Sequence, residues 1–514
     1  MSLRQRRLPT ANGSQNGDND EEGGSSRHNM NGYSNKSVGR SGVTLKPPSL
    51  LVLVIVVFFV GFKVGSISER SNANVKLGDM ERFFLRISNM EKFYDSDGPP
   101  PNLMVVGKRD HYTPVPPESR RLFYTEKKGA TTITRAFRHE GWTLVDEHDI
   151  FKAHIFYRAR GHKPDTKLNP WQRFSRVKGS DNWEAKDGFF NGFKEYSKKH
   201  PEHDLYFLPE TYCLEDEQQQ QDFAKRLEEG GGKSEPWLLK KVSVNNGQGI
   251  EVIGPHSKAL DTAVARSIKD KGNRYIIQNY ICDELTWFNG NKFDLRMYWV
   301  VASVDPPIVL YHDGYVRVGG SAYNETDFSN TANHLTNHAF RTSETTDVTA
   351  DDLYRRIRDH YSQNYDRLSS RITDSVQHVR SQMKEAIGTL YAAFKDVFPP
   401  KDYIKYYGTE NIFGFYGCDF VIDNDLNVHF LEAQASPGFG ESYDYRVELF
   451  RDLYRPIPGI VEEIALKQQE NANANILPLQ TLQGYEIVYA GNWQYKYKNY
   501  QKPTTKKPCV VQTD

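Results

Sequence analysis

Two carboxylates near the carboxyl end of the chain are spaced so that a β-hairpin would bring them face to face. Residues 415–422 and 428–433 are apolar and β-prone, and the Asn- and Asp-rich residues 423–427 between them favour a turn. We therefore predict a hairpin. A turn centred between positions 425 and 426 pairs Asp419 with Glu432.

Gln434 adds an amide oxygen to these two carboxylates, on the face of Glu432 and opposite the small Gly417. Like charges that face each other are destabilising, so either the register differs or a positive group lies between them. Carboxylate and amide oxygens suit Mg²⁺, and Asp419, Glu432 and Gln434 are therefore predicted metal ligands. The alternative is an exposed hairpin whose acids only face water.

A second group of charged residues lies in a strand-like stretch, residues 292–304. Side chains alternate along a strand, so Lys292, Asp294 and Arg296 share one face and the apolar side chains between them share the other. Phosphate binding uses such a set, with lysine as a point charge and arginine as a bidentate fork. An ion-paired face in contact with solvent has the same pattern.

Upstream, two further stretches have a pattern that suits a nucleotide. The apolar run 237–240 ends in Lys240 and is followed by a short loop with Gly247 and Gly249, whose backbone N–H groups could approach phosphate oxygens. The loop has neither P-loop nor GxGxxG spacing, and taken alone it is more often a turn.

The β-prone run 276–281 could hydrogen-bond an adenine edge through its backbone, with Gln278 contacting an amino group. A core strand is the alternative. Arg317 and Asn337, the latter in the polar stretch 334–337, complete the set. In isolation each would be an ordinary surface or hydrogen-bonded residue.

Composition and charge place few limits on function. The 514 residues exceed one ordinary domain. Sixty-six Lys and Arg balance 66 Asp and Glu, so charge predicts no nucleic-acid partner. The four cysteines are widely spaced and form no CxxC pair, which indicates neither a zinc site nor a disulfide-rich scaffold, although a single bridge remains open.

The amino-terminal region predicts a membrane anchor. Residues 1–46 have the polar composition of a disordered tail. Residues 50–62 are an uncharged apolar run that reaches a spanning length when extended to 47–67, and residues 68–102 resemble a stem. We predict a single-pass membrane protein, with the folded domain either in the cytosol or in the Golgi or ER lumen. A buried core segment and a signal peptide are the alternatives.

Further elements are predicted from periodicity. Residues 121–125, 155–158 and 275–280 are strand-like, and residues 187–199 form a helical pattern. Between 349 and 398, apolar residues recur at spacings of three and four, with a capping box at Thr349. After residue 466 the composition becomes polar and basic, which favours a solvated tail.

In their order along the chain, these pieces resemble the tubulin-tyrosine ligase-like family of ATP-grasp ligases. The resemblance covers roughly residues 150–450 and is carried by 291–303 (NKFDLRMYWVVAS), 334–337 (HLTN) and 416–437 (YGCDFVIDNDLNVHFLEAQASP). Lys186, in a Lys-Asp pair, matches a lysine motif of that family. Two positions depart from the family pattern: Gln434 stands where Asn is usual, and Lys241 where Pro is usual.

The resemblance implies an α+β, ATP-grasp fold in which two α+β subdomains clasp ATP, preceded here by a smaller α/β subdomain. The domains would then be 103–235 (amino-terminal α/β subdomain), 236–466 (ATP-grasp catalytic region) and 467–514 (polar, basic tail), after the tail, anchor and stem described above.

The same resemblance assigns roles to the candidate residues. It implies nucleotide contacts for the lysines, the adenine-side residues and the glycines, and phosphoryl contacts for the arginines, with Asn337 beside them. The nucleotide set is Lys186, Lys240, Gly247, Gly249, Gln278, Tyr280, Ile281, Lys292 and Asp294, the catalytic set is Arg296, Arg317 and Asn337, and the metal set is Asp419, Glu432 and Gln434.

The implied reaction is ATP- and Mg²⁺-dependent ligation of a free amino acid to a carboxylate of an acceptor protein, with tubulin as a candidate acceptor and an acyl phosphate as the intermediate. Two other function classes stay open. The replacement at Gln434 favours a membrane-anchored pseudoenzyme that binds nucleotide without ligating. The tail, anchor and stem layout suggests a glycosyltransferase, but the folded region has no convincing DxD site.

Overall fold

The structure is a computed structural model that describes residues 98–125, 131–157, 167–229, 231–244, 247–337, 347–397, 401–409, 411–435, 437, 444–498 and 500–501. All of them belong to the second of the two units into which the chain divides, Arg82–Asp514. The predicted disordered tail, the predicted anchor at 47–67 and most of the predicted stem lie outside the described residues.

The prediction of a single-pass membrane protein is corrected, and with it the predicted membrane partner. Among the described helices, none has the length and apolar character needed to cross a bilayer, which takes about 20 mostly apolar residues. The 20-residue helix α10 (Ser375–Phe394) illustrates the reason, because it carries Arg380, Lys384 and Glu385.

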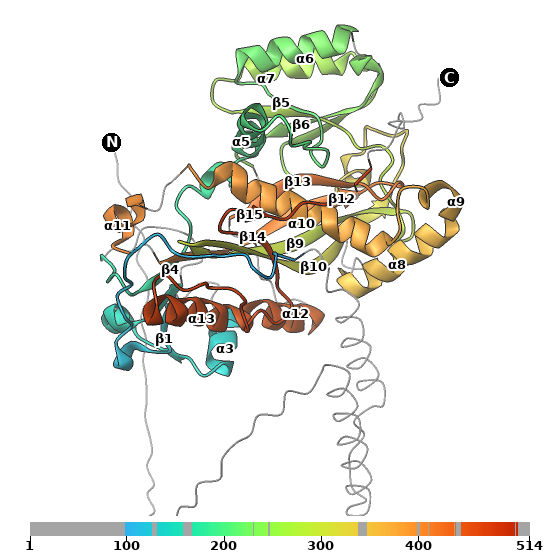
Figure 1. Ribbon diagram of the computed structural model, residues 1–514. Coiled ribbons are helices and arrows are strands. Elements are labelled where there is room, and N and C mark those ends of the chain that lie inside the picture. Colours follow the sequence, from blue (N-terminus) through green and yellow to red (C-terminus); the bar gives the residue numbers. More distant parts are fainter. Residues whose placement is uncertain are drawn as a thin grey trace, which may run out of the picture. The chain divides into compact units, whose positions relative to one another are not determined.

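A mixed sheet of eleven strands forms the centre of the molecule (Figure 1). Its order is β15-β14-β10-β9-β12-β4-β3-β1-β2, with β11 beside β10 and β13 beside β12. Its strands are β1 (Leu122–Thr125), β2 (Thr143–Leu144), β3 (Ile155–Tyr157), β4 (Arg173–Ser175), β9 (Asn291–Val304), β10 (Pro307–Ala322), β11 (Val348–Thr349), β12 (Ile412–Ile422), β13 (Val428–Gln434), β14 (Glu486–Ala490) and β15 (Trp493–Gln494).

The predicted boundary at residue 235 does not separate two sheets. The short strands β1 to β4 pair in parallel with one another, and β4 pairs in parallel with β12 through Phe174 and Ile412. The amino-terminal strands therefore extend the same sheet as β9 and β10. Every residue of β12 is buried, as expected for a strand covered on both faces.

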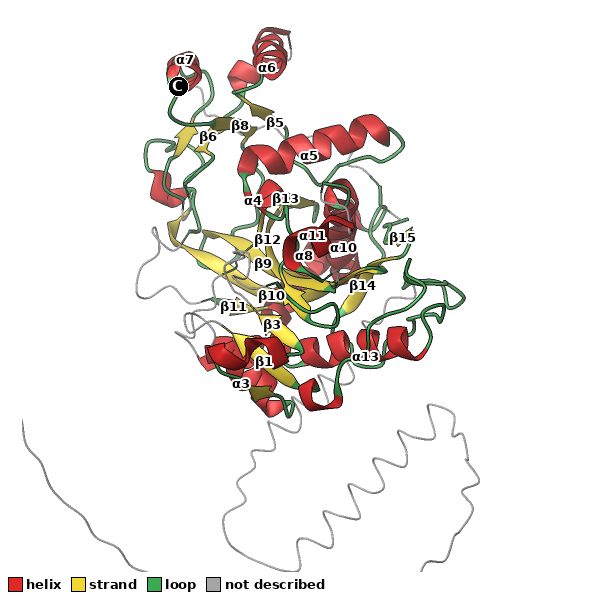
Figure 2. Cartoon of the chain, turned by 90° about the vertical axis from the view of Figure 1, so that its left-hand side faces the viewer, coloured by secondary structure: helices red, strands yellow, loops and turns green. Residues whose placement is uncertain are grey.

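Helices cover both faces of this sheet (Figures 1 and 2). One face packs against α5 (Lys186–Lys199), α8 (Ala350–Gln363) and α10, and the other against α3 (Thr131–His139), α12 (Asp444–Tyr454) and α13 (Pro456–Glu470). Strand β9 alternates between the two cores: Met297 and Trp299 lie in the first, Tyr298 and Val300 in the second. Shorter helices are α4 (Asp181–Glu184), α9 (Tyr365–Leu368) and α11 (Lys401–Tyr407).

A second, antiparallel sheet has its own core. Its order is β5-β8-β6-β7, formed by β5 (Thr211–Cys213), β6 (Trp237–Lys241), β7 (Ile250–Ile253) and β8 (Tyr275–Asn279). Helices α6 (Glu217–Glu229) and α7 (Ala259–Lys269) pack on it, and Trp237, Leu239 and Ile277 are buried between them (Figure 1). The fold is therefore mixed α/β. The chain passes from the large sheet to the second sheet through α4 and α5, between β4 and β5, and returns through the connection from β8 to β9.

Most periodicity-based predictions agree with the structure. The predicted strands and helices appear within a few residues of their expected bounds, and the Thr349 hydroxyl caps α8 by accepting a hydrogen bond from Asp352 N at 3.2 Å. The carboxyl-terminal region differs. Part of the predicted solvated tail, β14 and β15, joins the large sheet beside β10, and Tyr495 is buried in its core.

Candidate functional site

The predicted hairpin is β12–β13, and the predicted pairing of its two carboxylates is present. The register shifts by one residue between Asp419 and Phe420, so the pairs nearer the turn do not follow the predicted centre between positions 425 and 426. Asp419 pairs with Glu432, and Gly417 with Gln434. The turn is stabilised by Asp423, whose Oδ1 accepts hydrogen bonds from Asp425 N at 3.0 Å and Asn427 N at 2.9 Å. Side chains of Asp and Asn that bond to their own backbone explain why this composition favours a turn.

Four charged residues lie side by side on β9, β10 and β12, and we call Asp294, Arg296, Arg317 and Asp419 the charged quartet. In the sheet, Arg296 pairs with Asp419 and Arg317 pairs with Asp294. Arg296 forms a fork on Asp419, with Nε–Oδ1 at 2.5 Å and Nη2–Oδ2 at 3.1 Å. Arg317 forms a second fork on Asp294, at 2.6 and 2.9 Å.

Arg317 also joins the two forks, because its Nη2 donates to Asp419 Oδ2 at 2.7 Å. The positive charge expected near Asp419 and Glu432 is thus supplied by Arg296 and Arg317. Burial acts to raise the pKa of Asp419, but the guanidinium groups of Arg296 and then Arg317 outweigh it and hold the pKa well below its ordinary value. Asp419 is therefore a carboxylate at physiological pH.

Glu432 and Gln434 lie at the edge of the quartet and are only half-buried. Gln434 Nε2 donates to Glu432 Oε1 at 2.9 Å and approaches Asp419 Oδ2 at 3.4 Å. Within the described residues, Glu432 forms no ion pair. The quartet is neutral in total, so Glu432 adds one negative charge that the neighbouring arginines do not balance.

These residues fit Mg²⁺ in their chemistry. Two carboxylates and an amide converge from neighbouring positions of one hairpin, all three offer oxygen, and the local charge is negative. Turning the Gln434 amide about its last bond would exchange Nε2 for the oxygen. Asp419 differs from Glu432 in that both of its oxygens already accept from arginine.

Lys292, the third member of the predicted charged strand, lies apart from the quartet in an aromatic cage. Its Nζ is 3.0 Å from Glu284 Oε1, 4.1 Å from the centre of the Tyr280 ring and 4.6 Å from that of Tyr323. Burial lowers the pKa of Lys292, and Glu284 opposes that shift. Tyr280 is itself fixed by a 2.7 Å hydrogen bond between its hydroxyl and His334 Nδ1.

Two further lysines and an amide lie near the second sheet: Lys240 and Gln278 are on its strands, and Lys186 is on α5. Lys240 Nζ donates to Gln278 Oε1 at 2.6 Å, from the neighbouring strand. Lys186, at the start of α5, donates from Nζ to the carbonyl of Val244 at 2.9 Å. Burial lowers the pKa of Lys240 to about 8, with Glu432 opposing the shift and Lys186 adding to it. Lys240 is thus near enough to sense both Glu432 and Lys186.

The remaining predicted residues lie around these groups. Gly247 and Gly249 have φ of 74° and 70° in the turn between β6 and β7, which explains why glycine occupies them. Tyr280 and Ile281 follow β8 directly. Asn337 is half-buried and ends the described stretch one residue after Thr336, whose hydroxyl hydrogen-bonds to Asp294 Oδ2.

Sequence reasoning missed three members of this region: Glu284, Tyr323 and Thr336. Thr336 is inside the HLTN stretch that the sequence analysis singled out, so the motif itself was the available signal. Glu284 and Tyr323 reach Lys292 from outside any recognised motif. Their contacts arise from tertiary packing, and nothing in the local sequence indicates them.

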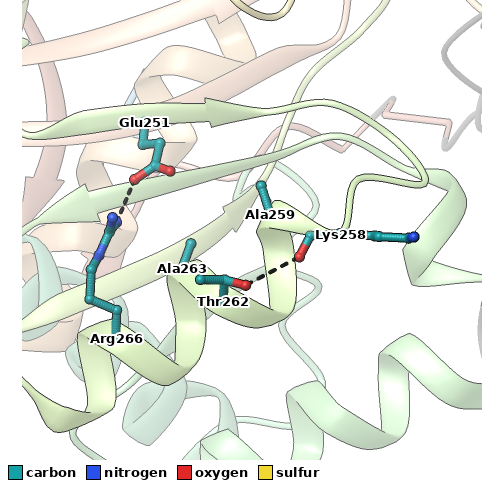
Figure 3. Close-up of a pocket in the computed structure, with 6 residues that line it drawn as sticks. All are labelled: Glu251, Lys258, Ala259, Thr262, Ala263 and Arg266. Carbon is teal, nitrogen blue, oxygen red and sulfur yellow. Dashed lines mark hydrogen bonds and ion pairs between the residues drawn. The ribbon is translucent and has the colours of Figure 1, made fainter.

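A cavity of about 380 Å³ lies elsewhere, between β7 and α7 (Figure 3). It is lined by Glu251, Lys258, Ala259, Thr262, Ala263 and Arg266. Figure 3 shows that its main polar contact is the 2.6 Å ion pair between Arg266 and Glu251, both largely exposed. None of the predicted site residues lines it, so this cavity is not the site described above.

Comparison with known proteins identifies relatives of the chain. A profile of the tubulin-tyrosine ligase family matches residues 165–458. Protein polyglycylase TTLL10 of Rattus norvegicus is 26% identical over 305 residues, which cover 55% of this chain and 42% of that protein. Inactive polyglycylase TTLL10 of Homo sapiens is 26% identical over 310 residues, with coverages of 55% and 42%.

Tubulin polyglutamylase TTLL7 of Mus musculus is 27% identical over 298 residues, which cover 55% of this chain and 31% of that protein. The chain therefore spans less than half the length of each of these three relatives. The match includes β4 and α5, the whole second sheet, and the quartet with its hairpin.

Proposed function

The chain belongs to the tubulin-tyrosine ligase family. We therefore propose that it is an ATP-dependent ligase with an ATP-grasp fold. In the proposed reaction, the amine of an amino acid is joined to a carboxylate of an acceptor protein. The observation that supports this most directly is the neutral quartet bordered by Glu432, a half-buried carboxylate without an ion pair among the described residues. The quartet and Glu432 together carry one net negative charge. Such a site would bind a nucleotide whose phosphates are partly neutralised by Mg²⁺ more readily than a nucleotide without the metal.

We assign the nucleotide to the region between the two sheets. Lys186 and Lys240 supply positive charge for phosphate oxygens, and the αL glycines 247 and 249 allow the backbone to approach them closely. Gln278, with the backbone at Tyr280 and Ile281, faces the base. Lys292 and Asp294 hold the remaining polar groups of the nucleotide from β9.

Asp419, Glu432 and Gln434 are the residues that would hold Mg²⁺. When bound there, the ion would neutralise part of the charge on the phosphate oxygens. Glu432 has the fewest contacts to give up, whereas Asp419 has to share its oxygens with Arg296 and Arg317. We therefore expect Glu432 to be the ligand on which metal affinity depends most.

Arg296 and Arg317 have the geometry to stabilise a transferring phosphoryl group. Both guanidinium groups are buried and already oriented by carboxylates, so little reorganisation is needed when charge develops nearby. In the proposed reaction a carboxylate oxygen attacks the γ-phosphorus and ADP leaves. The amine nitrogen then attacks the acyl carbon, loses a proton, and phosphate leaves.

The second candidate function is a nucleotide-binding protein that does not ligate. Gln434 supports it, because a longer amide stands where Asn is usual in the family and its nitrogen faces both carboxylates. A relative that matches this chain over 55% of its length bears the name inactive polyglycylase TTLL10. Both candidates predict ATP binding, and they differ only in product formation.

One experiment separates them. The full chain is incubated with ATP, Mg²⁺, all amino acids and candidate acceptors that include tubulin, and the acceptors are analysed by mass spectrometry. A ligase yields acceptors heavier by an amino-acid residue, with ADP formed in proportion. Glu432→Gln should lower that rate by about a thousandfold, the upper range for losing one electrostatic group at a reacting phosphoryl.

The exposed Glu448, on α12, provides the matched control. Glu448→Gln makes the same chemical change away from the site and should leave the rate within about twofold of the unaltered chain. Equal rates for Glu432→Gln and Glu448→Gln would reject the metal assignment. ATP binding without any acceptor product would favour the second candidate.

A further inference from the structure

Three side chains of a kind that bind transition metals gather where α5 ends, at the opposite end of this helix from Lys186. They are His200, Glu202 and His203, and one ligand atom from each lies within 4.8 Å of the other two. The Glu202 side chain is exposed, at 62%, and that of His200 is partly exposed, at 43%, so an ion in solution can reach them. The proposed ligase mechanism uses none of the three.

Two of the three interatomic distances already suit coordination. His200 Nδ1 is 3.3 Å from Glu202 Oε1, and His203 Nε2 is 3.7 Å from the same oxygen. A tetrahedral zinc ion with bonds of about 2.0–2.1 Å separates its ligand atoms by about 3.4 Å. The two imidazoles would have to move closer together, and their rings, now stacked at 14° with centroids 5.4 Å apart, would have to tilt so that both ring planes contain the ion.

The backbone holds these ligands in place before any ion binds. His200 N donates to Tyr196 O at 2.9 Å, which ends the helix, and His203 N donates to His200 O at 3.0 Å. The two histidines therefore belong to one tight turn on the end of α5. A turn of this kind reduces the entropy that is lost when an ion orders its ligands.

Tyr196 supplies an outer contact of the sort found around metal sites. Its hydroxyl is 2.7 Å from His203 Nδ1 and 3.5 Å from Gln494 Oε1. If the hydroxyl proton points to Gln494, His203 carries its proton on Nδ1, donates it to Tyr196, and leaves the Nε2 lone pair directed at Glu202.

We propose that His200, Glu202 and His203 form a binding site for a zinc-type divalent ion, with the fourth coordination position open to water. Two imidazoles and a carboxylate are a donor set that zinc and its neighbours in the first row prefer, whereas Mg²⁺ prefers oxygen. The bound ion would tie the end of α5 to the segment that leads to β5. Through Tyr196 and Gln494 it would also couple that end to β15.

The test is a Co²⁺ titration of the full chain, in excess Mg²⁺ so that oxygen sites are filled, followed by displacement with Zn²⁺. We expect one equivalent of Co²⁺ per chain with visible absorption of a nitrogen-ligated ion, which Zn²⁺ removes. His203→Ala should lower the affinity at least a hundredfold. His148→Ala, which alters an exposed histidine on another segment, should leave the affinity unchanged.

Two further variants change residues around the proposed metal ligands rather than the ligands themselves. Tyr196→Phe should weaken binding by roughly tenfold, the lower range for an outer-contact loss. Lys496→Gln should strengthen binding, because it removes a cation that acts on His203. Glu432→Gln should leave Co²⁺ binding intact, so failure of the proposed ligase function would not be mistaken for failure here. Equal affinities in the His203→Ala and His148→Ala variants would overturn the proposal.

Discussion

Two networks of acidic and basic side chains each include a residue of strand β10, but the residues at the border of each network differ. The charged quartet includes Arg317 of β10. The second network includes Asp313 of the same strand, with Arg380 and Lys384 from α10 and Glu486 from β14. Each of the two networks contains two carboxylates and two cations. The side chains of the quartet are 3–13% exposed, whereas Asp313 and Glu486 of the second network are 24% and 19% exposed.

The difference lies at their borders. In the second network Asp313 also accepts hydrogen bonds from Tyr311 at 2.5 Å and Tyr354 at 2.6 Å, and Lys384 is 3.0 Å from Glu486. Charge is balanced and the neighbours are apolar or aromatic. The quartet instead continues into Glu432 and Gln434, which are half-buried. We therefore treat buried charge alone as insufficient to identify a functional site, and we propose that the unbalanced charge of Glu432 distinguishes the candidate site from the second network.

The largest effect that would test this comparison is on stability. Arg380→Met keeps the side-chain volume but leaves Asp313 and Glu486 with less compensation. Burial acts to raise the pKa of Asp313, and Arg380 is the main group that lowers it. We expect the free energy of unfolding to fall by about 3–5 kcal/mol, measured by urea denaturation, while the ligation rate per folded molecule stays the same.

The same substitution at an exposed pair provides the control. Arg355 forms its ion pair with Asp352 at the surface of α8, where its side chain is 67% exposed, and Arg355→Met should barely change the denaturation midpoint. A lost ligation rate in folded Arg380→Met protein would show that the second network also takes part in function.

The next effect is on turnover. Arg317→Lys keeps the positive charge but cannot form the fork on Asp294 while also contacting Asp419. We expect kcat to fall about a hundredfold with little change in melting temperature. Arg226→Lys removes a comparable pair of contacts, to Glu210 and Glu235 on the second sheet, and should leave kcat unchanged. Equal losses in both variants would indicate a general cost of replacing a paired arginine.

The smallest expected effect is on pH dependence. The pKa of Lys240 is lowered to about 8 by burial, so its ammonium is lost as the pH rises through that value. Affinity for a non-hydrolysable ATP analogue, measured by calorimetry, should therefore fall by about eightfold between about pH 7.5 and about pH 9. Lys240→Arg should flatten this profile because a guanidinium stays charged. An unchanged slope in that variant would place the titrating group elsewhere.

The sequence predicts contacts within one strand or hairpin better than it predicts contacts between residues that are far apart in the chain. The pairing of Asp419 with Glu432 and the shared face of Lys292, Asp294 and Arg296 follow from alternation along strands, and both agree with the structure. The one-residue register shift next to Asp419 does not follow from alternation and was not predicted. The need for a positive group near Asp419 follows from charge alone. Which arginine supplies it does not, because β9 and β12 are separated by more than a hundred residues.

The predictions that differ from the structure share a physical cause. Strand β4 has only three residues, too few to show a period, so the continuation of the sheet through Phe174 was not predictable. Strands β14 and β15 are short and lie within a largely polar stretch, where the apolar run of β14 was not recognised. They are held by pairing with β10 and with each other, and Val488, Tyr489 and Ala490 of β14 are buried in the cores. Local patterns do not report such long-range pairing.

The parallel pairing of β4 with β12 also determines how this chain can be shortened. The family match begins at residue 165 and ends at 458, so a fragment cut to those limits would lack β1 to β3 on one side and β14 on the other. Both β4 and β10 would then present unpaired N–H and C=O groups along an open border, inviting self-association of fragments. Purification attempts should keep residues 98 to 501 together.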